Sequence, residues 1–227
     1  MRYFRPLIVL FSVFGIHAAD NSLQAVWTRM DSAASRFKGM RANIHRLARL
    51  EVIKEDTVED GKIAVRRPNA KDLRMLILIN PPNEKKVLIA ANKVEIYYPK
   101  MNTVQEYELG KTGSLKDQLL SLSFGSTSKE LLAGYSVTLG PSETVGGQKT
   151  TRLDLTPKDK ELLKHYPKIQ LWISDENGVT VQQKLNEPAG DYNQATYTNI
   201  ELANLSEGDV RLDIPKDAVR EKPQKQR

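Results

Sequence analysis

Apolar positions near the start of the chain recur at the spacing of an amphipathic helix. They come at intervals of one, three and four residues: Leu23, Val26, Trp27, Met30, Ala33, Ala34 and Phe37. This spacing places them along one face of a helix, which Asn21 and Gln24 are predicted to cap and Gly39 to end. Because one apolar stripe on one helix cannot bury itself, we expect a sheet to receive it.

From residue 40 onward, apolar and polar residues alternate, which is typical of strands with one buried face. The first such run covers residues 40–52, and Arg46 interrupts its alternation, which predicts a bulge near that point. The dipeptide Asp60-Gly61 predicts a hairpin turn between this strand and a second strand at residues 62–67.

The rest of the chain shows further short apolar runs separated by turn residues. A nearly all-aliphatic run at residues 73–79 ends before Pro81-Pro82, and Gly146-Gly147 and Asn177-Gly178 mark later turns. Further strands are predicted at residues 87–90, 94–98, 103–109, 135–139, 148–155, 169–173, 179–185, 192–201 and 210–214. About eleven strands at such intervals predict an α+β protein with a strongly curved antiparallel sheet. The spacing leaves open whether this sheet closes.

The middle of the chain has a different pattern, which predicts two short helices bounded by glycine. The first is expected to begin at Ser114, and the second covers residues 128–133. Their apolar side chains include Leu115, Leu119, Leu122 and Leu131. Helices this short do not form a core by themselves, so we expect both on the concave side of the sheet, as packing or as a movable lid.

The first nineteen residues are predicted to be a signal peptide. Arg2 and Arg5 supply a positive start, and residues 7–16 form an uncharged, largely apolar run. This run is too short for a bilayer span, which needs about 20 apolar residues. We therefore expect cleavage after Ala19 and export to the periplasm, with an uncleaved anchor as the alternative.

Charge and cysteine content narrow the class of partner. The net charge is +6, which becomes +4 when Arg2 and Arg5 leave with the signal peptide, and Lys and Arg are interleaved with Asp and Glu. This pattern does not favour nucleic-acid binding. The chain has no cysteine, so burial must stabilise it without disulfides.

We expect one domain at residues 20–215. A basic tail at residues 216–227 is expected to be flexible, or in weak contact with anionic lipid headgroups.

The sequence carries no arrangement typical of an active site. His17 lies in the predicted leader, and His45 and His165 are not at metal-ligand spacing, so we predict no metal site. No nucleophile elbow, phosphate-binding loop or dinucleotide motif occurs, and Ser123 has no histidine near it in sequence. We predict no catalytic residue and no cofactor. A hydrolase using Ser123 or paired carboxylates is the alternative, with these candidates: Asp154, Asp159, Glu161, Asp175 and Glu176.

Four short motifs follow the predicted first helix in a recognisable order. They are RPNAKDLR at residues 67–74, VEIYYPK at 94–100, LDLTPK at 153–158 and LDIP at 212–215. In this order the chain resembles the LolA family of lipoprotein carriers. The resemblance implies an unclosed barrel of about eleven antiparallel strands, with helices as a lid over a groove for acyl chains.

The resemblance also implies a non-enzymatic transport role. Members of the family carry lipoproteins across the periplasm, from an inner-membrane ABC-type releasing complex to an outer-membrane receptor. We expect a monomer. Arg74 falls where the resemblance implies an arginine that holds the lid helices by hydrogen bonds to their backbone. Leu73 and Met75 stand where the family commonly has aromatic residues, which keeps open a relative with other cargo, such as a hopanoid or a glycolipid.

Aliphatic residues beside Arg74 and in the central helices are the candidates for groove and lid. They are Leu73, Met75, Ile77, Ile79, Leu115, Leu119, Leu122 and Leu131. For each of them, ordinary core packing is the competing interpretation. A module that docks another protein on its curved sheet is the competing function.

Overall fold

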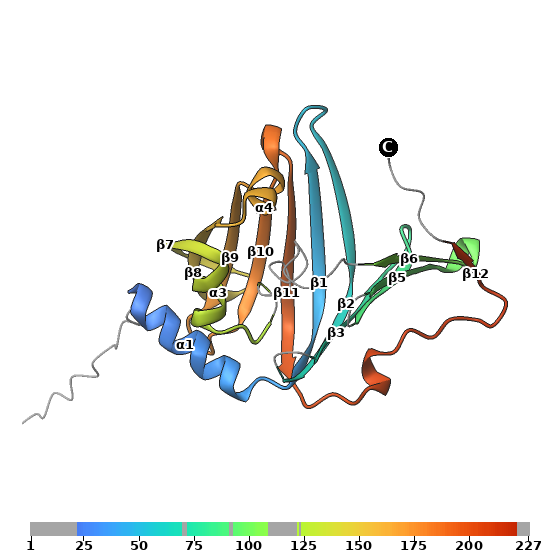
Figure 1. Ribbon diagram of the computed structural model, residues 1–227, viewed down its shortest axis with the longest axis horizontal. Coiled ribbons are helices and arrows are strands. Elements are labelled where there is room, and N and C mark those ends of the chain that lie inside the picture. Colours follow the sequence, from blue (N-terminus) through green and yellow to red (C-terminus); the bar gives the residue numbers. More distant parts are fainter. Residues whose placement is uncertain (1–21, 70–71, 91–92, 109–121, 123, 222–227) are drawn as a thin grey trace, which may run out of the picture.

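The computed structural model describes residues 22–69, 72–90, 93–108, 122 and 124–221 (Figure 1). Its strands are β1 (Gly39–Leu50), β2 (Glu55–Asn69), β3 (Asp72–Ile79), β4 (Lys85–Ala90), β5 (Lys93–Tyr98), β6 (Thr103–Glu108), β7 (Tyr135–Val145), β8 (Gln148–Pro157), β9 (Lys168–Ser174), β10 (Thr180–Asn186), β11 (Tyr192–Leu202) and β12 (Val219–Glu221).

These strands form one sheet of twelve strands in the order β12-β6-β5-β4-β3-β2-β1-β11-β10-β9-β8-β7. All neighbours are antiparallel except β12, which pairs with β6 in parallel. Since β12 and β7 are the two edges, the sheet is an unclosed barrel, and the expected fold class is confirmed. The expectation of about eleven strands missed β12 and placed a strand at residues 210–214 instead.

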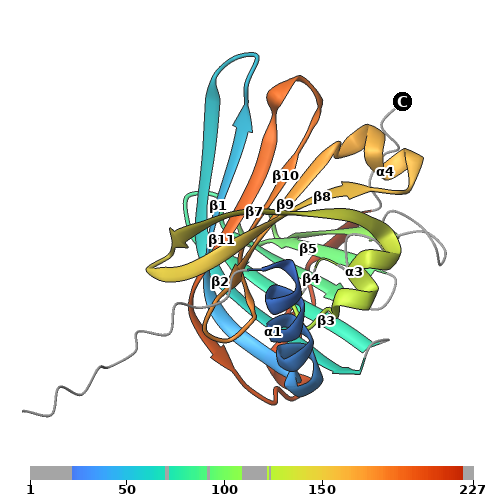
Figure 2. The same ribbon diagram turned by 90° about the vertical axis from the view of Figure 1, so that its left-hand side faces the viewer.

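Three α-helices accompany the sheet in the described part of the chain: α1 (Leu23–Arg36), α3 (Ser128–Gly134) and α4 (Lys160–His165). Three 3-10 turns are η1 (Pro99–Met101), η2 (Pro188–Gly190) and η3 (Gly208–Val210). The helix α1 begins at Leu23 and is capped by Ser22, whose hydroxyl accepts a hydrogen bond from Ala25 N at 3.2 Å. The cap is therefore Ser22, while Asn21 lies outside the described residues. Figure 2 shows α1 and α3 near each other on one side of the sheet.

The turn between β1 and β2 is not where Asp60-Gly61 predicted it. The chain turns at residues 51–54, and β2 runs through Gly61, which pairs with Ile44 on one side and Ile79 on the other. A Cβ built on Gly61 lies 2.0 Å from the Leu78 carbonyl oxygen. The glycine thus permits close approach of two strands, which is the other use of glycine within a strand.

The bulge predicted near Arg46 lies elsewhere. Arg46 pairs in regular register with Glu59 on β2 and with Ala195 on β11, whereas the irregularity in β1 falls between Arg41 and Asn43. The two later turns are confirmed, because Gly146-Gly147 joins β7 to β8 and Asn177-Gly178 joins β9 to β10.

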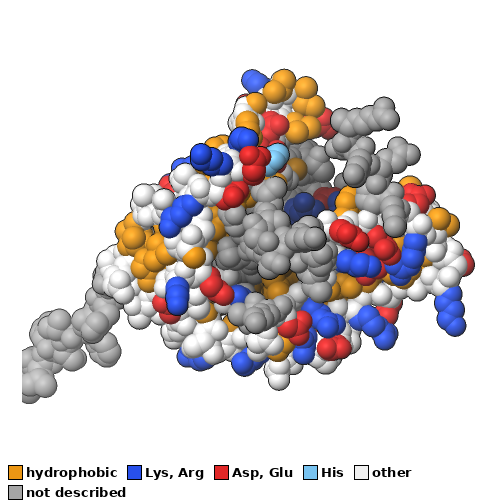
Figure 3. All heavy atoms as spheres, in the orientation of Figure 1, with side chains coloured by type: hydrophobic (Ala, Val, Ile, Leu, Met, Phe, Trp, Pro, Cys, Tyr) orange, Lys and Arg blue, Asp and Glu red, His pale blue; other side chains and the backbone are white. Residues whose placement is uncertain are grey.

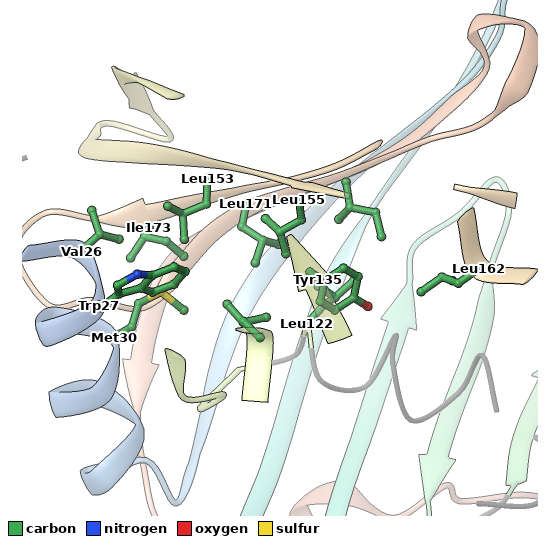
Figure 4. Close-up of a cluster of buried hydrophobic side chains, with 12 residues drawn as sticks. Val26, Trp27, Met30, Leu122, Tyr135, Leu153, Leu155, Leu162, Leu171 and Ile173 are labelled. Carbon is green, nitrogen blue, oxygen red and sulfur yellow. The ribbon is translucent and has the colours of Figure 1, made fainter. Parts of the chain in front are cut away.

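Three apolar clusters hold these elements together. The first packs α1 and α3 against β7 to β9 and contains Trp27, Tyr135 and Leu153 (Figure 4). The second joins the end of α1 to β1, β2 and β11 through side chains such as Met40, which is fully buried. Burial of a large aliphatic side chain stabilises the fold by about 1.5–3 kcal/mol, so these clusters replace the disulfides that the chain lacks.

The third cluster lies on the outer face of the sheet, under the chain that follows β11. Leu205, Val210 and Leu212 from this segment pack on Leu76 and Tyr97 of the sheet. The segment then reaches β12, where Arg220 donates to Glu95 at 2.9 Å and also pairs with Glu106. Residues 219–221 of the expected flexible tail are therefore ordered in β12, and residues 222–227 lie outside the described residues.

No helix in the described ranges is long and apolar enough to cross a membrane. Figure 3 shows basic and acidic side chains interspersed over the visible face, as their order in the chain predicts. This distribution offers no broad basic surface on that face.

Candidate functional site

The inner face of the curved sheet encloses a cavity of about 590 Å³, here called the hollow. Side chains from β1 to β5, β10 and β11 line it, and Leu122, Phe124 and Tyr166 contribute from the connecting segments. Most of the lining is apolar and includes Ile44, Ile63, Met75, Ile77, Val87, Ile89, Ile96 and Leu185. The volume falls within the range of about 300–1,000 Å³ that is usual for sites of small ligands.

Strand alternation decides which residues reach the hollow. On β3, Met75 and Ile77 line it, whereas Leu76 lies in the outer apolar cluster. Successive side chains of a strand point to opposite faces, so Arg74 shares the outer face with Leu76. Arg74 Nε accordingly donates to Asp72 Oδ1 at 3.3 Å, and its guanidinium lies 3.6 Å from Glu207 Oε1.

The predicted groove and lid residues divide into three groups. Met75, Ile77 and Leu122 line the hollow. Leu73 packs against the second core cluster, and Ile79 and Leu131 are buried, Leu131 within the first cluster. Leu115 and Leu119 lie outside the described residues, as does Ser123 of the hydrolase alternative, so their predicted roles stay predictions.

Arg67, rather than Arg74, contacts the segment that leads into α3. Its Nη1 lies 3.3 Å from both the Phe124 carbonyl oxygen and the Ser126 hydroxyl, and its Nη2 donates to Glu130 Oε1 at 2.9 Å. Only 9% of Arg67 is exposed. Ile63, Val65 and Arg67 are alternate residues of β2, and Ile63 and Val65 face inward. Strand alternation in the sequence could therefore have predicted that Arg67 faces inward as well. The latch predicted for Arg74 stays a prediction for residues 109–121, which the structure does not describe.

The start of α3 is also held by α1. Asp31 accepts two hydrogen bonds from Ser128, from the backbone N–H at 2.7 Å and from the hydroxyl at 2.6 Å. Glu130 completes a capping box with Thr127, whose N–H donates to Glu130 Oε2 at 2.7 Å. The segment that holds Leu122 and Phe124 is thus bound where it enters α3, by Asp31 of α1 and by Arg67 of β2.

Comparisons with solved structures identify proteins that share this fold. An uncharacterized conserved protein from Thermus thermophilus aligns with a TM-score of 0.54 at 13% identity, covering 88% of this chain and 98% of that one. A crystal structure of MucB aligns with a TM-score of 0.51 at 16% identity, over 87% of this chain. The likeness is one of fold alone. This chain spans 64% of the MucB chain.

A LolA superfamily protein from Nitrosomonas europaea aligns more loosely, with a TM-score of 0.41 at 12% identity over 83% of this chain and 97% of that one. No family model matches the chain, and no curated protein matches it in sequence.

Among the described residues that line the hollow, the charged ones are Arg46 and Lys85, and both contact Glu59. Arg46 Nη1 donates to Glu59 Oε2 at 2.7 Å, and Lys85 Nζ donates to Glu59 Oε1 at 2.5 Å. Arg46 and Lys85 line the hollow, while the Glu59 side chain is only 9% exposed. We call these three residues the charged triad.

Three tyrosines beside the hollow keep their hydroxyl protons at neutral pH. Burial raises the pKa of Tyr98, and the nearby Tyr107 and Glu59 add to this shift. Burial likewise raises the pKa of Tyr166, helped by Glu187, and raises that of the fully buried Tyr197. Their phenols therefore add no negative charge to the wall of the hollow.

Three of the carboxylates considered for acid–base chemistry, Asp154, Asp159 and Asp175, have structural partners. Asp159 caps α4 by accepting from Leu162 N at 2.8 Å, and Asp175 accepts from Thr151 Oγ1 at 2.7 Å. Burial acts to raise the pKa of Asp154, but the hydrogen bond from Gln170 and nearby positive charges outweigh it and hold that pKa below its usual value. Across the described ranges, no group of three or more His, Cys, Asp or Glu is placed to hold a metal ion.

Proposed function

We propose that this protein is a carrier that shields an acyl chain in the hollow. The observation that carries the proposal is the apolar cavity of about 590 Å³ on the inner face of an unclosed barrel, which the side chains of the described residues leave unfilled. A sheet built only for stability would pack its inner face at the density of other protein interiors.

Burial of hydrocarbon supplies the binding energy for such a ligand. About five methylene groups at roughly 0.8 kcal/mol each give about 4 kcal/mol, without any directed chemistry. Release of the acyl chain then depends on a partner that binds it more tightly or that stabilises a more open state of the carrier. The bound lipid itself favours whichever state of the carrier binds it more tightly.

The resemblance to LolA-type carriers supports a more detailed form of the proposal. In this form the protein is a periplasmic, non-enzymatic monomer whose cargo is the acyl chains of lipoproteins. It receives them from an inner-membrane ABC-type complex and delivers them to an outer-membrane receptor. Another lipid, such as a hopanoid or a glycolipid, is the alternative cargo.

Titration with a diacylated peptide tests the proposal, with the same peptide lacking acyl chains as the reference. We expect saturable binding of the acylated peptide only. Ile77→Glu places a charge in the hollow and is expected to weaken binding by about tenfold or more, because a buried unpaired charge is costly. Leu78→Glu is the matched control, since Leu78 is the next residue of β3 and is exposed on the outer face. Absence of saturable uptake by the wild-type protein contradicts the proposal.

One observation favours a second function, the docking of a protein partner. The tip of the β1–β2 hairpin exposes two aliphatic side chains, Val52 at 80% and Ile53 at 62%. Glu51 N donates to Asp191 Oδ1 at 2.7 Å, which ties this tip to the neighbouring β10–β11 connection. A docking module predicts that the peptide without acyl chains binds as well as the acylated one, and that Val52→Ser with Ile53→Ser abolishes this binding.

A further inference from the structure

The charged triad brings together side chains from three different strands. Arg46 and Glu59 are direct cross-strand partners in the β1–β2 pair. Lys85 stands at the start of β4, so it reaches Glu59 of β2 past the intervening β3. Two cations therefore converge on one carboxylate at the inner face of an otherwise largely apolar wall.

The triad lies where the hollow meets a second cavity. This cavity has a volume of about 220 Å³ and shares three lining residues with the hollow: Arg46, Lys85 and Asn193. Its other lining residues are Leu47 and Ala48 of β1 and Thr57 and Glu59 of β2. Most residues that line the hollow are apolar, whereas charged and polar residues form the larger part of the residues that line the smaller cavity. A ligand that spans both would need an apolar part and a polar part.

Among the described residues that line the two cavities, the charged side chains give this junction a net positive charge. Arg46 and Lys85 carry two positive charges against the one negative charge of Glu59, and Glu187, which accepts from Asn193 at 2.6 Å, lines neither cavity. A guanidinium has five N–H donors and an ammonium has three. Glu59 accepts one hydrogen bond from each, which leaves further donors of both groups for an anion.

We propose that the ligand of this protein is an anionic lipid with a phosphate headgroup, held by Arg46 and Lys85 while its acyl chain lies in the hollow. The inference rests on the proposed function, because it assigns the headgroup of the carried lipid. A phosphate has several acceptor oxygens and accepts charge-assisted hydrogen bonds from Arg and Lys together. Glu59 keeps the two cations side by side before the ligand arrives.

Binding of two lipids with the same acyl chain tests this inference. One is a lysophosphatidic acid, which carries a phosphate, and the other is the matching monoacylglycerol, which is uncharged. We expect the full-length protein to bind the phosphate lipid at least about tenfold more tightly, a difference of about 1.4 kcal/mol. We expect higher salt to reduce this ratio, because ions screen the attraction.

Variants test whether the charged triad causes the preference for the phosphate lipid over the uncharged lipid. Arg46→Gln with Lys85→Gln is expected to bring the ratio of the two affinities close to one. Arg49→Gln is the matched control, because Arg49 lies on the same strand, pairs with Glu51 and Asp56, and lines neither cavity. It is expected to keep the wild-type ratio. Should the double variant fail to fold, Lys85→Gln alone is expected to lower the ratio of the two affinities. The salt dependence of that ratio in the wild-type protein then tests the headgroup assignment independently.

The outcomes separate this inference from the proposed function. Equal affinity of the wild-type protein for both lipids, or a ratio that survives in the double variant, overturns the headgroup assignment and leaves the acyl carrier standing. Failure to bind either lipid overturns both. Inorganic phosphate is expected to leave the bound lipid in place. If it displaces the lipid at a concentration similar to the lipid's own, the site takes free anions, and the assignment is overturned.

Discussion

Arg67 Nη2 donates to Glu130 Oε1 at 2.9 Å, and this ion pair joins the end of β2 to the first turn of α3. The two residues are far apart in the sequence, and Glu130 also caps its own helix through Thr127. The segment at Leu122 and Phe124, which lines the hollow, comes just before this junction. Arg67 therefore controls how the central segment meets the sheet.

Replacing Arg67 is expected to loosen this junction. Arg67→Met removes the hydrogen bonds to Phe124 O, Ser126 and Glu130, and we expect a loss of about 1–3 kcal/mol in the free energy of unfolding. The loss is limited because the Glu130 side chain is 34% exposed, so water can solvate its carboxylate. Urea denaturation measures the loss. Retention of an acylated peptide is expected to fall as well.

Arg74→Leu is the informative comparison for Arg67. Arg74 is partly exposed on the outer face, where its ion pairs with Asp72 and Glu207 are worth at most about 1 kcal/mol. We expect a free energy of unfolding near that of the wild-type protein, so that cargo retention by this variant reports on the predicted latch alone. If Arg74→Leu releases cargo and Arg67→Met does not, the assignment of Arg67 is wrong and the latch predicted for Arg74 gains support.

Gly61 is expected to tolerate no side chain. A Cβ at this position lies 2.0 Å from the Leu78 carbonyl oxygen, so Gly61→Ala must push β2 and β3 apart, at a cost of about 1–3 kcal/mol or more. Gly134→Ala is the control, because a Cβ at Gly134 meets no atom within 4 Å. Thermal unfolding is expected to show a clear drop for the first variant and no drop for the second.

Acid is expected to destabilise the outer face of β8 and β9 through Asp154. Its folded pKa lies below the ordinary value of 3.8, so the carboxylate contributes stability above that value and loses it as the pH falls through the folded pKa. Asp154→Asn is expected to lower stability at pH 7 and to flatten its decline below about pH 4. Urea midpoints measured between pH 7 and pH 3 check this, with the exposed Asp213→Asn as control; equal acid sensitivity of wild type and Asp154→Asn refutes it.

Trp27 is expected to be the main contact that holds α1 on the sheet. Its side chain is buried in the first apolar cluster beside Met30 (Figure 4), and Trp27→Ala is expected to cost about 3–5 kcal/mol, because the cavity it leaves adds to the lost burial. Leu132→Ala, at an exposed position of α3, is the control. A small loss at Trp27 in calorimetry would mean that α1 contributes little to the core.

Local periodicity predicted much of the fold. The apolar stripe of α1, the alternation along β1 and the aliphatic run of β3 identified these elements, because burial of one face imposes a period that is visible in the sequence. Met75 and Ile77 of this run were among the groove candidates, and both line the hollow. The turns at Gly146-Gly147 and Asn177-Gly178 were predictable for a similar reason, since their chemistry is local.

Local patterns also misled where a residue serves a distant neighbour. Asp60-Gly61 has the composition of a turn, but Gly61 is required by the backbone of β3 at Leu78. Arg220 was expected in a free tail, yet Glu95 and Glu106 hold it against the far edge of the sheet. In both cases the deciding contact is with a strand that the local sequence does not specify.

The sequence by itself determined that this chain forms a curved antiparallel sheet with one apolar face and a helix to cover part of it. Only the tertiary structure decided that the described residues leave a hollow on the inner face, that Arg67 contacts the segment before α3, and that Arg46 and Lys85 meet at Glu59. Alternation assigns a side chain to a face within one strand. Strand order and sheet curvature, which depend on contacts between distant segments, decide which side chains then meet.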